Sequence, residues 1–286
     1  MRNLIEQQKN FMNTIITIKV VQIDQHTVQI LDTIEEAFYE FDRVVKKFTR
    51  FNEDSELTNL NRQAGDWVKV SREFFDLIKF MLEMFKQTSG FFDPTIIDFL
   101  ETYGYDPNYN FSKLENPNLP KEILNIAKKR PSFNEISLDE KNLKVKLKPK
   151  QRIDLGAIGK GWAMDLASQK IKKVSGDFLI DAGGDVIAYG KNALSKPWNV
   201  TLKSKNREIG TINLQNQAIA SSGNWARKVK FFHHLINPFT GQPVETNYDT
   251  VFVVAQTSLV ADAWATALFV GGPKTKCPDD IFVKFT

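Results

Sequence analysis

Apolar residues recur along this chain at two spacings, one typical of helices and one typical of strands. In residues 32–48 and 71–89 they return every three or four positions, which predicts two amphipathic helices. Short runs that are β-branched or that alternate apolar with polar positions predict strands. The strand segments are residues 14–23, 198–203, 209–214, 250–255 and 281–285, a pair around a glycine turn in 177–190, and one that opens 218–227. The chain therefore mixes helices with strands.

Polar residues mark where helices begin and end. Ser71 stands at the N-cap position of the helix over 71–89, Glu73 follows in the first turn, and Gly90 ends the helix. Ser55 is placed to cap a short helical turn after it.

Two further helices and three irregular segments complete the prediction. Residues 121–129 form a short basic helix, and residues 257–272 form a helix that is apolar on nearly every side, with Ser258 placed to cap it. A surface loop is predicted over 103–120 from its Asn and Pro content. A hairpin is predicted over 134–147, with its turn at 139–142. A strand that enters a Pro/Gly turn is predicted over 231–244.

Three glycines surround one lysine in residues 152–165, which read R-I-D-L-G-A-I-G-K-G-W-A-M-D. The pattern predicts a strand end at 153–155, a glycine-rich turn, and a helix over 162–174. Free N–H groups at a helix start attract an anion, and Lys160 adds a positive charge, so phosphate suits this turn. The alternative is a tight turn whose glycines serve packing alone. The segment is neither a Walker A loop nor a G-x-G-x-x-G fingerprint.

Asp262 and Thr266 lie four residues apart in the apolar helix over 257–272, so they share one face. Burying a carboxylate without a partner is very costly. One explanation is a cation, because carboxylate and hydroxyl oxygens are hard ligands that suit Mg²⁺. The other is that Asp262 pairs with a buried lysine or caps a neighbouring helix.

Aromatic residues and histidines give weaker signals. Phe91 and Phe92 precede an Asp-Pro turn, where they either form a wall for a planar ring or fill the core. His233 and His234 follow a predicted strand, a position typical of structural histidines, and His26 is the third histidine of the chain. The sequence shows no internal repeat, Cys/His metal cluster or Ser/His/Asp order.

Composition and charge exclude several classes of protein. The 286 residues are 42% hydrophobic and 25% charged, with a formal net charge of +4, which is ordinary for a globular chain. No dense Lys/Arg stripe interleaved with aromatics argues for nucleic acid, and no run is long enough to span a bilayer. Cys277 is the single cysteine, so an internal disulfide is excluded. With no signal peptide visible, we expect a cytoplasmic protein, or an exported or membrane-anchored one if an N-terminal signal has been lost.

Seven motifs stand in one order from about residue 11 to residue 272. In that order they resemble the FAD:protein FMN transferase family, the ApbE-type flavin transferases. Each motif is weak alone, and seven in family order make chance a poor explanation. They are F-N-E-D-S-E-L-T-N-L-N-R, G-F-F-D-P-T-I, D-L-G-A-I-G-K-G-W-A-M-D, L-I-D-A-G-G-D-V-I-A-Y-G, A-I-A-S-S-G-N-W-A-R, H-H-L-I-N-P-F-T-G-Q-P-V and V-A-D-A-W-A-T-A-L-F-V-G-G.

The resemblance implies a fold and a reaction. The fold is α+β, a single two-lobed ApbE-like (T-fold-like) domain over residues 1–286. It has mixed or antiparallel sheets, flanking helices, a nucleotide in a central cleft, and a variable loop and hairpin at about 103–150. The reaction splits FAD at its pyrophosphate with Mg²⁺, moves FMN onto a Thr or Ser hydroxyl of an acceptor protein, and releases AMP. Some members instead hydrolyse FAD to FMN and AMP.

Carried over motif by motif, the resemblance also implies site residues. Asp262 and Thr266 would bind Mg²⁺ through their side chains, and Ala157 through its backbone carbonyl. Asp154 and Lys160 would contact FAD. The FAD site would further be lined by Met12, Phe51, Phe91, Phe92, Asp93 and Leu235.

Phosphoryl transfer needs cationic charge on the phosphate oxygens and an aligned nucleophile more than it needs covalent chemistry from the protein. Mg²⁺ and Lys160 would supply the charge, and His234 or Asp262 would accept the hydroxyl proton. The acceptor would be a transient partner that lays a flexible segment across the cleft. We expect no nucleic-acid partner.

Three hypotheses remain at this point. They are the flavin transferase, a Mg²⁺-dependent FAD pyrophosphatase, and a flavin-binding module without turnover. Two departures from the family pattern bear on the first two, because Asn13 replaces a common Gly and Phe51 replaces a common Tyr beside the flavin site. The intact set of Lys160, Asp262 and Thr266 argues against the third.

Overall fold

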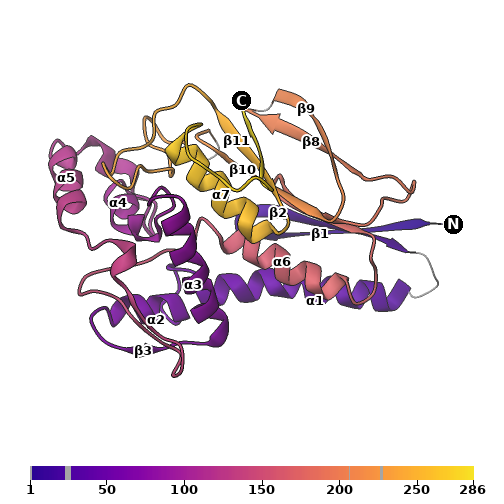
Figure 1. Ribbon diagram of the computed structural model, residues 1–286, viewed down its shortest axis with the longest axis horizontal. Helices are drawn as coiled ribbons and strands as arrows, with labels where there is room; N and C mark the ends of the chain where they lie inside the picture. Colours follow the sequence, from indigo (N-terminus) through magenta and orange to yellow (C-terminus); the bar gives the residue numbers. More distant parts are fainter. Residues whose placement is uncertain (1, 23–26, 206, 226–227) are drawn as a thin grey trace.

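A computed structural model of the protein describes residues 2–22, 27–205, 207–225 and 228–286. Strands gather at one end of the molecule and short helices at the other (Figure 1). Two longer helices, α1 (Thr27–Phe48) and α6 (Gly159–Ile171), pack on each other alongside the sheet. The predicted mixture of α and β elements in two lobes is what the structure shows.

The larger sheet contains seven strands in the order β1-β2-β6-β7-β10-β11-β12. Every neighbouring pair in it is antiparallel. Its strands are β1 (Asn3–Phe11), β2 (Thr14–Gln22), β6 (Phe178–Ala182), β7 (Asp185–Tyr189), β10 (Gln217–Gly223), β11 (Thr250–Ala255) and β12 (Phe282–Phe285).

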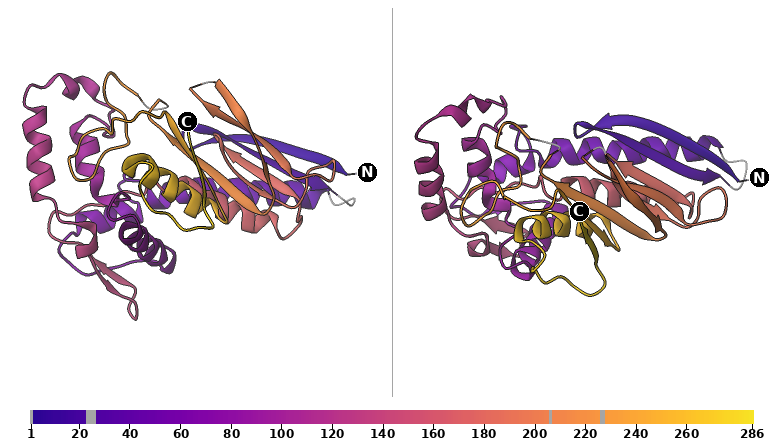
Figure 2. Two further views of the ribbon diagram at one scale, coloured as in Figure 1. Left: turned by 45° about the horizontal axis from the view of Figure 1, so that its top comes forward. Right: turned by 90° about the horizontal axis from the view of Figure 1, so that it is seen from above.

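Alternation along these strands buries both faces of the sheet. Ile180 and Ile187 point into the core shared with the helices, whereas Leu179 and Ala188 point to the opposite face. That opposite face is covered by a two-stranded ribbon of β8 (Trp198–Ser204) and β9 (Arg207–Leu214). The sheet is therefore a middle layer between the helices and this ribbon, which Figure 1 shows from the side. In the left view of Figure 2, where the top of Figure 1 comes forward, the ribbon lies in front of the sheet.

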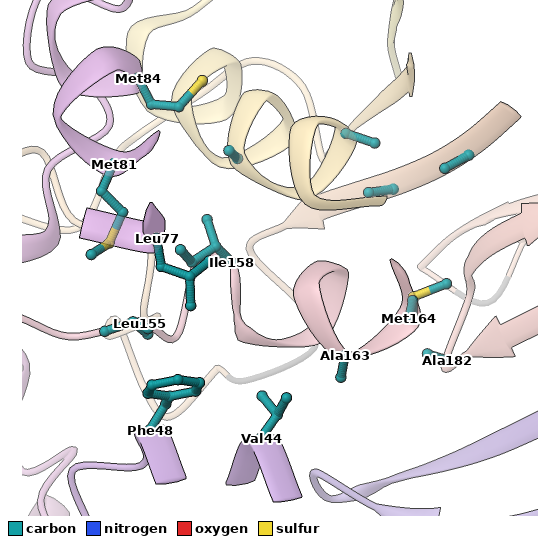
Figure 3. Close-up of a cluster of buried hydrophobic side chains, with 14 of the residues drawn as sticks. Val44, Phe48, Leu77, Met81, Met84, Leu155, Ile158, Ala163, Met164 and Ala182 are labelled. Carbon is teal, nitrogen blue, oxygen red and sulfur yellow. The ribbon is translucent and has the colours of Figure 1, made fainter. Parts of the chain in front are cut away.

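The main core joins the sheet to the helices. The last helix, α7 (Ser258–Gly271), packs on β10 and β11, and α3 (Arg72–Gln87) closes the core from the helical end. Figure 3 shows side chains of α1, α3, α6 and the turn before α6 meeting below α7, among them Val44, Leu77 and Ile158. The single domain over residues 1–286 remains a prediction, which this shared core supports.

The helical lobe is built from short elements. Besides α3 it contains α2 (Glu56–Arg62), α4 (Ile97–Thr102) and α5 (Leu119–Lys129), and a small sheet of β3 (Val68–Lys69), β5 (Lys144–Lys146) and β4 (Ser137–Asp139). Phe99, Tyr103 and Ile123 form a second core there with Phe232 and Ile236 from the second half of the chain. Three 3₁₀ turns connect these elements: η1 (Pro94–Ile96), η2 (Phe111–Glu115) and η3 (Phe133–Glu135).

Most predicted elements are confirmed, with their caps. The Ser55 and Ser71 hydroxyls accept hydrogen bonds from the third residue of α2 and α3. The basic helix, the 134–147 hairpin and the predicted strands of the second half are present, apart from the strand within 231–244. Position 23, His26 and positions 226–227 lie outside the described residues.

Two predicted strands are wrong. Residues 153–155 belong to no strand, because their backbone pairs elsewhere: Ile153 exchanges hydrogen bonds with the side chain of Asn61, and Asp154 donates to the carbonyl of Pro94. Residues 231–244 form only isolated bridges, such as Ile236 with Pro243 across the predicted turn. This second segment lines the cavity described below, and the first leads into the glycine-rich turn.

Element boundaries account for the other differences. Strand β1 was not predicted, because it is an exposed edge strand with a mostly polar sequence. Helix α1 starts five residues before the predicted position 32, and α6 starts at Gly159 rather than 162. The cap of α7 is Thr257 instead of Ser258, and the loop over 103–120 contains η2 and a buried Leu114. In the ranges that the structure describes, no helix has the length and apolarity to cross a membrane.

Candidate active site

The glycine-rich turn runs straight into α6. Gly159 closes the turn by donating its N–H to the carbonyl of Leu155 at 2.8 Å. Asp154 accepts the N–H of Gly156 on Oδ2 at 3.1 Å, and its own N–H donates to the carbonyl of Pro94 at 2.8 Å. The Asp154 backbone thus ties the turn to the segment that contains Phe91 and Phe92.

Gly161 is required where α6 crosses α7. A Cβ at this position would lie 2.5 Å from the carbonyl oxygen of Ser258, so the two backbones touch. The packing role therefore holds for this glycine. Its N–H also donates to Asp262 Oδ2 at 3.0 Å, so Asp262 on α7 caps the start of α6. Capping of a neighbouring helix is one of the two alternatives to a metal that the sequence left open.

Lys160 lies between two buried carboxylates. Its Nζ forms an ion pair with Asp185 Oδ2 and lies 3.9 Å from Asp262 Oδ1. The other oxygen of Asp185 accepts the N–H of Ser221 at 2.9 Å, so Asp185 is held by the sheet. The pairing of Asp262 with a lysine is thus also present, and Lys160 brings its positive charge to the carboxylate that was assigned to the metal.

Three oxygen atoms of the proposed metal set come from two segments. Asp262 and Thr266 lie one turn apart on α7, and Ala157 belongs to the turn before α6. The hydroxyl of Thr266 is 3.4 Å from that of Ser222. Carboxylate, hydroxyl and carbonyl oxygens are hard donors, so this set fits Mg²⁺ in its chemistry. Among the residues described here, no group of three or more His, Cys, Asp or Glu side chains is arranged to hold a metal. A cation at this place would therefore also need oxygens from a bound nucleotide or from water.

A small cavity of about 30 Å³ gathers seven of the predicted site residues. η1 and the segment before it form one wall, the loop after the histidine pair forms another, and the turn before α6 and α7 close the cavity. The predicted residues that line it are Phe91, Phe92, Asp93, Ala157, His234, Leu235 and Thr266.

Asp93 lines this cavity with its carboxylate fully engaged by protein groups. Oδ1 accepts hydrogen bonds from the N–H and the hydroxyl of Thr95, at 2.8 and 2.6 Å. Oδ2 forms an ion pair with Arg130 at 2.8 Å. The expected contact of Asp93 with FAD is therefore better explained through the backbone of this turn than through its carboxylate.

The two histidines of the pair have different environments. His233 is buried; its Nδ1 accepts the N–H of Leu235 at 3.3 Å and its Nε2 faces the carbonyl of Val244 at 3.1 Å. Burial lowers the pKa of His233, so the neutral ring with a proton on Nε2 fits these contacts. His234 instead lines the cavity together with Thr266. The structural role that the sequence suggested for these histidines therefore applies to His233.

Met12 and Phe51 are not among the residues that line the cavity. Met12 is at the tip of the β1–β2 hairpin with φ of 52°, and this hairpin rests on Gly183, two residues before Asp185. Phe51 is 42% exposed and lies under the guanidinium of Arg50 at 4.5 Å. Arg50 Nε in turn is 3.6 Å from Asp154 Oδ1.

Three residues at the site were not predicted from the sequence. Asp185 lies within a quoted motif, but its spacing does not reveal that it faces Lys160. Asp165 caps α7 from α6, with Oδ1 and Oδ2 accepting the N–H groups of Ser258 and Leu259 at 2.8 and 2.9 Å, and burial raises the pKa of Asp165. Arg130 lies in a basic segment that looks like a solvated surface, and only the fold brings it to Asp93.

The chain resembles known proteins over nearly its full length. The model of the ApbE family matches residues 12–277. A FAD:protein FMN transferase of Haemophilus influenzae is 29% identical over 259 residues, which cover 84% of this chain and 74% of the relative. The enzyme of the same name from Chlamydia muridarum is 30% identical over 238 residues, 80% of this chain and 72% of the relative.

Solved structures agree. The crystal structure of the ApbE protein from Thermotoga maritima has a TM-score of 0.84 and 30% identity, covering 95% of this chain and 88% of that one. The apo flavinyl transferase ApbE of Pseudomonas stutzeri, at 18% identity and a TM-score of 0.82, supports the fold alone. The family match and the shared fold together show that this chain belongs to the ApbE family.

Proposed function

We propose that this chain transfers FMN from FAD onto a Thr or Ser hydroxyl of an acceptor protein and releases AMP. The observation that carries the proposal is that Thr266 lines a cavity together with Phe91 and His234, while Asp262, one turn earlier on α7, lies 3.9 Å from Lys160 at the start of α6. Family membership and the names of the relatives support the same reaction.

In this reaction the oxygen of the acceptor hydroxyl forms a bond to the phosphorus of the FMN half. The bond from that phosphorus to the bridging oxygen of the pyrophosphate breaks, and AMP leaves with that oxygen. The protein's contribution is charge and alignment. Lys160, at the start of α6, is placed to bind a phosphate oxygen, where the helix N-terminus also favours negative charge.

Asp262, Thr266 and the carbonyl of Ala157 are the groups that would hold Mg²⁺. The ion would neutralise negative charge on the diphosphate when bound. Asp185 would keep Lys160 directed toward this charge, since its carboxylate is fixed by Ser221.

His234 is the better candidate for the group that accepts the hydroxyl proton. It lines the cavity, whereas Asp262 Oδ2 accepts the N–H of Gly161 and Oδ1 faces Lys160. A base must lie within hydrogen-bond reach of the proton it removes, and its basicity is reduced by nearby cations. These contacts leave Asp262 suited to hold charge rather than to take up a proton.

The cavity of about 30 Å³ is far smaller than FAD, so it would hold one part of the dinucleotide and leave the rest at its mouth. Phe51 and Met12 do not line the cavity, and they would contact the outer parts of FAD. An acceptor would reach the phosphorus by laying a flexible segment over this mouth, which implies a transient partner. The cytoplasmic location likewise remains a prediction.

The test is to incubate the protein with FAD and Mg²⁺, with and without an acceptor domain. We expect AMP and a mass gain equal to FMN on the acceptor when all components are present. AMP and free FMN in equal amounts, with no gain on the acceptor, would instead identify a FAD pyrophosphatase that uses water in place of the hydroxyl. Tight FAD binding with no AMP under either condition would identify a binding module.

A further inference from the structure

Arg130 connects two walls of the cavity that are more than 130 residues apart in sequence. It follows α5 directly and its guanidinium side chain is 12% exposed. One wall is the turn that contains Asp93 and Thr95, and the other is the loop that contains Leu235 and Pro238. Arg130 reaches both.

The contacts form a fork. Nη2 lies 2.8 Å from Asp93 Oδ2 and donates to the carbonyl of Pro238 at 2.7 Å. Nη1 donates to the hydroxyl of Thr95, and the guanidinium lies 5.3 Å from the ring centre of Phe99. A planar guanidinium with several fixed donors can hold three acceptors at set positions, which a lysine ammonium on a flexible stem does less well.

Asp93 and Thr95, both contacted by Arg130, are also bonded to each other within the first wall. Asp93 Oδ1 accepts two hydrogen bonds from Thr95, so Arg130, Asp93 and Thr95 form a closed ring of contacts in a buried place. Asp93 directly follows Phe91 and Phe92 in the chain, and all three residues line the cavity. A change in Arg130 would thus alter the position of those aromatic rings relative to Leu235.

We propose that Arg130 is a positioning residue that sets the separation of the two cavity walls and thereby the affinity for FAD. The inference rests on the proposed function, because it concerns the same cavity. Arg130 is not itself a lining residue of the cavity. It acts on the ligand through Phe91, Phe92 and Leu235. Asp93 is then a partner of Arg130 rather than a direct contact of its carboxylate with FAD.

The test compares Arg130→Met, Arg130→Lys and Asp93→Asn, together with the Arg130→Met/Asp93→Asn pair. FAD affinity is measured from the change in flavin fluorescence without an acceptor, and kcat and KM are measured separately. We expect Arg130→Met to weaken FAD binding on the order of tenfold or more, since small displacements of positioning groups are costly. Arg130→Lys should be intermediate, and KM should change more than kcat.

The paired variant separates positioning from charge balance, and it also covers the case in which Arg130→Met alone fails to fold. It removes the unpaired carboxylate but still lacks the bond to Pro238, so we expect its FAD affinity to match that of Arg130→Met. Asp93→Asn should weaken FAD binding less than Arg130→Met, because Arg130 keeps its bonds to Thr95 and Pro238. Recovery of full affinity in the pair would overturn the proposal, since Arg130 would then only neutralise Asp93. A larger loss in Asp93→Asn than in Arg130→Met would also overturn it.

Arg152→Ala is the matched control. Arg152 is an arginine of the same region whose guanidinium binds Asp98 and Glu101 of α4. Its loss should leave FAD affinity within about twofold, because Arg152 is not among the residues that line the cavity. An equal loss in Arg152→Ala and Arg130→Met would overturn the positioning role. If the unmodified protein binds FAD but transfers nothing, the proposed function alone fails; if it does not bind FAD, both fail.

Discussion

Asp165 and Asp262 cap each other's helices. Asp165 on α6 accepts the N–H groups of Ser258 and Leu259 at the start of α7, and Asp262 on α7 accepts the N–H of Gly161 at the start of α6. The two helices therefore fix each other's N-termini. The glycine-rich turn at Lys160 and the proposed metal ligands are carried by this one reciprocal unit.

Replacing Asp262 should separate its two roles. In Asp262→Asn the amide oxygen can still accept the N–H of Gly161, so we expect the free energy of unfolding to fall by no more than about 1 kcal/mol. The charge facing Lys160 and the proposed cation is lost, and turnover should be abolished. AMP release and chemical denaturation are the measurements. Normal Mg²⁺-dependent turnover in this variant would refute the metal assignment.

Replacing Asp165 should act on stability first. Asp165→Ala leaves two buried N–H groups without an acceptor, and we expect a loss of about 3 kcal/mol in the free energy of unfolding. Thr257→Ala removes a hydroxyl cap of the same helix, which accepts only the N–H of Val260, and should cost about 1 kcal/mol. If both variants unfold at the same denaturant concentration, the carboxylate adds nothing beyond an ordinary cap. In folded Asp165→Ala, the Mg²⁺ concentration for half-maximal AMP release should rise, because α7 carries the ligands.

The sequence predicts the parts of this site that depend on local spacing. Asp262 and Thr266 are found because two polar residues four apart interrupt an apolar helix, and the turn at Lys160 is found from its glycines. Asp185, Asp165 and Arg130 are missed because each acts on a partner distant in sequence. The spacing of residues along the chain does not show that Asp185 of β7 pairs with Lys160 of α6. Nor does it show that Arg130, which follows α5, pairs with Asp93.

The errors in the fold have a similar origin. Residues 153–155 look like a strand end because Ile153 and Leu155 flank one polar residue, but Asn61 supplies the hydrogen bonds of Ile153 in place of a neighbouring strand. Thr257 and Ser258 are both good capping residues, and the choice depends on which residue adopts the extended backbone before α7. Propensity alone cannot decide that, since Asp165 fixes where the helix begins.

Lys160→Ala should weaken FAD binding more than riboflavin binding. Only FAD carries the diphosphate, so removal of a cation at the start of α6 affects FAD selectively. The loss for FAD should be on the order of tenfold or more, given that hydrogen bonds to charged groups contribute about 1.5–3 kcal/mol. Fluorescence titrations with both ligands measure this. Equal losses would show that Lys160 serves only to neutralise Asp185 and Asp262.

Glu73 should make the stability of the fold depend on pH in the acid range. It joins α3 to Arg43 and Lys47 of α1, at 2.7 and 2.8 Å, and to the indole of Trp162 on α6 at 2.9 Å. Burial by itself raises the pKa of Glu73, but hydrogen bonds from these three groups outweigh it and lower the pKa from 4.5 to about 2.

A lowered pKa in the folded state means that the unfolded chain binds the proton more readily. The stabilisation by Glu73 is therefore complete above pH 4.5 and is lost as the pH falls from about 4.5 to about 2. At pH 7 we expect Glu73→Gln to cost about 2 kcal/mol, and the difference from the unmodified protein should shrink across that range. Glu53→Gln is the control, because Glu53 pairs with Arg62 on the surface. If the free energy of unfolding of Glu73→Gln differs from that of the unmodified protein by the same amount at every pH, the assignment is contradicted.

The adjacent histidines offer the sharpest separation of catalysis from structure. His234→Gln should lower kcat by a factor on the order of 10² to 10⁴ if it accepts the hydroxyl proton, and should leave the free energy of unfolding nearly unchanged. His233→Ala should instead destabilise the fold by about 1–3 kcal/mol, because the N–H of Leu235 and the carbonyl of Val244 lose their partner. Single-turnover AMP release and chemical denaturation on both variants give the comparison. If His233→Ala loses kcat without destabilisation while His234→Gln remains active, the two roles are reversed, and the base belongs to the buried ring.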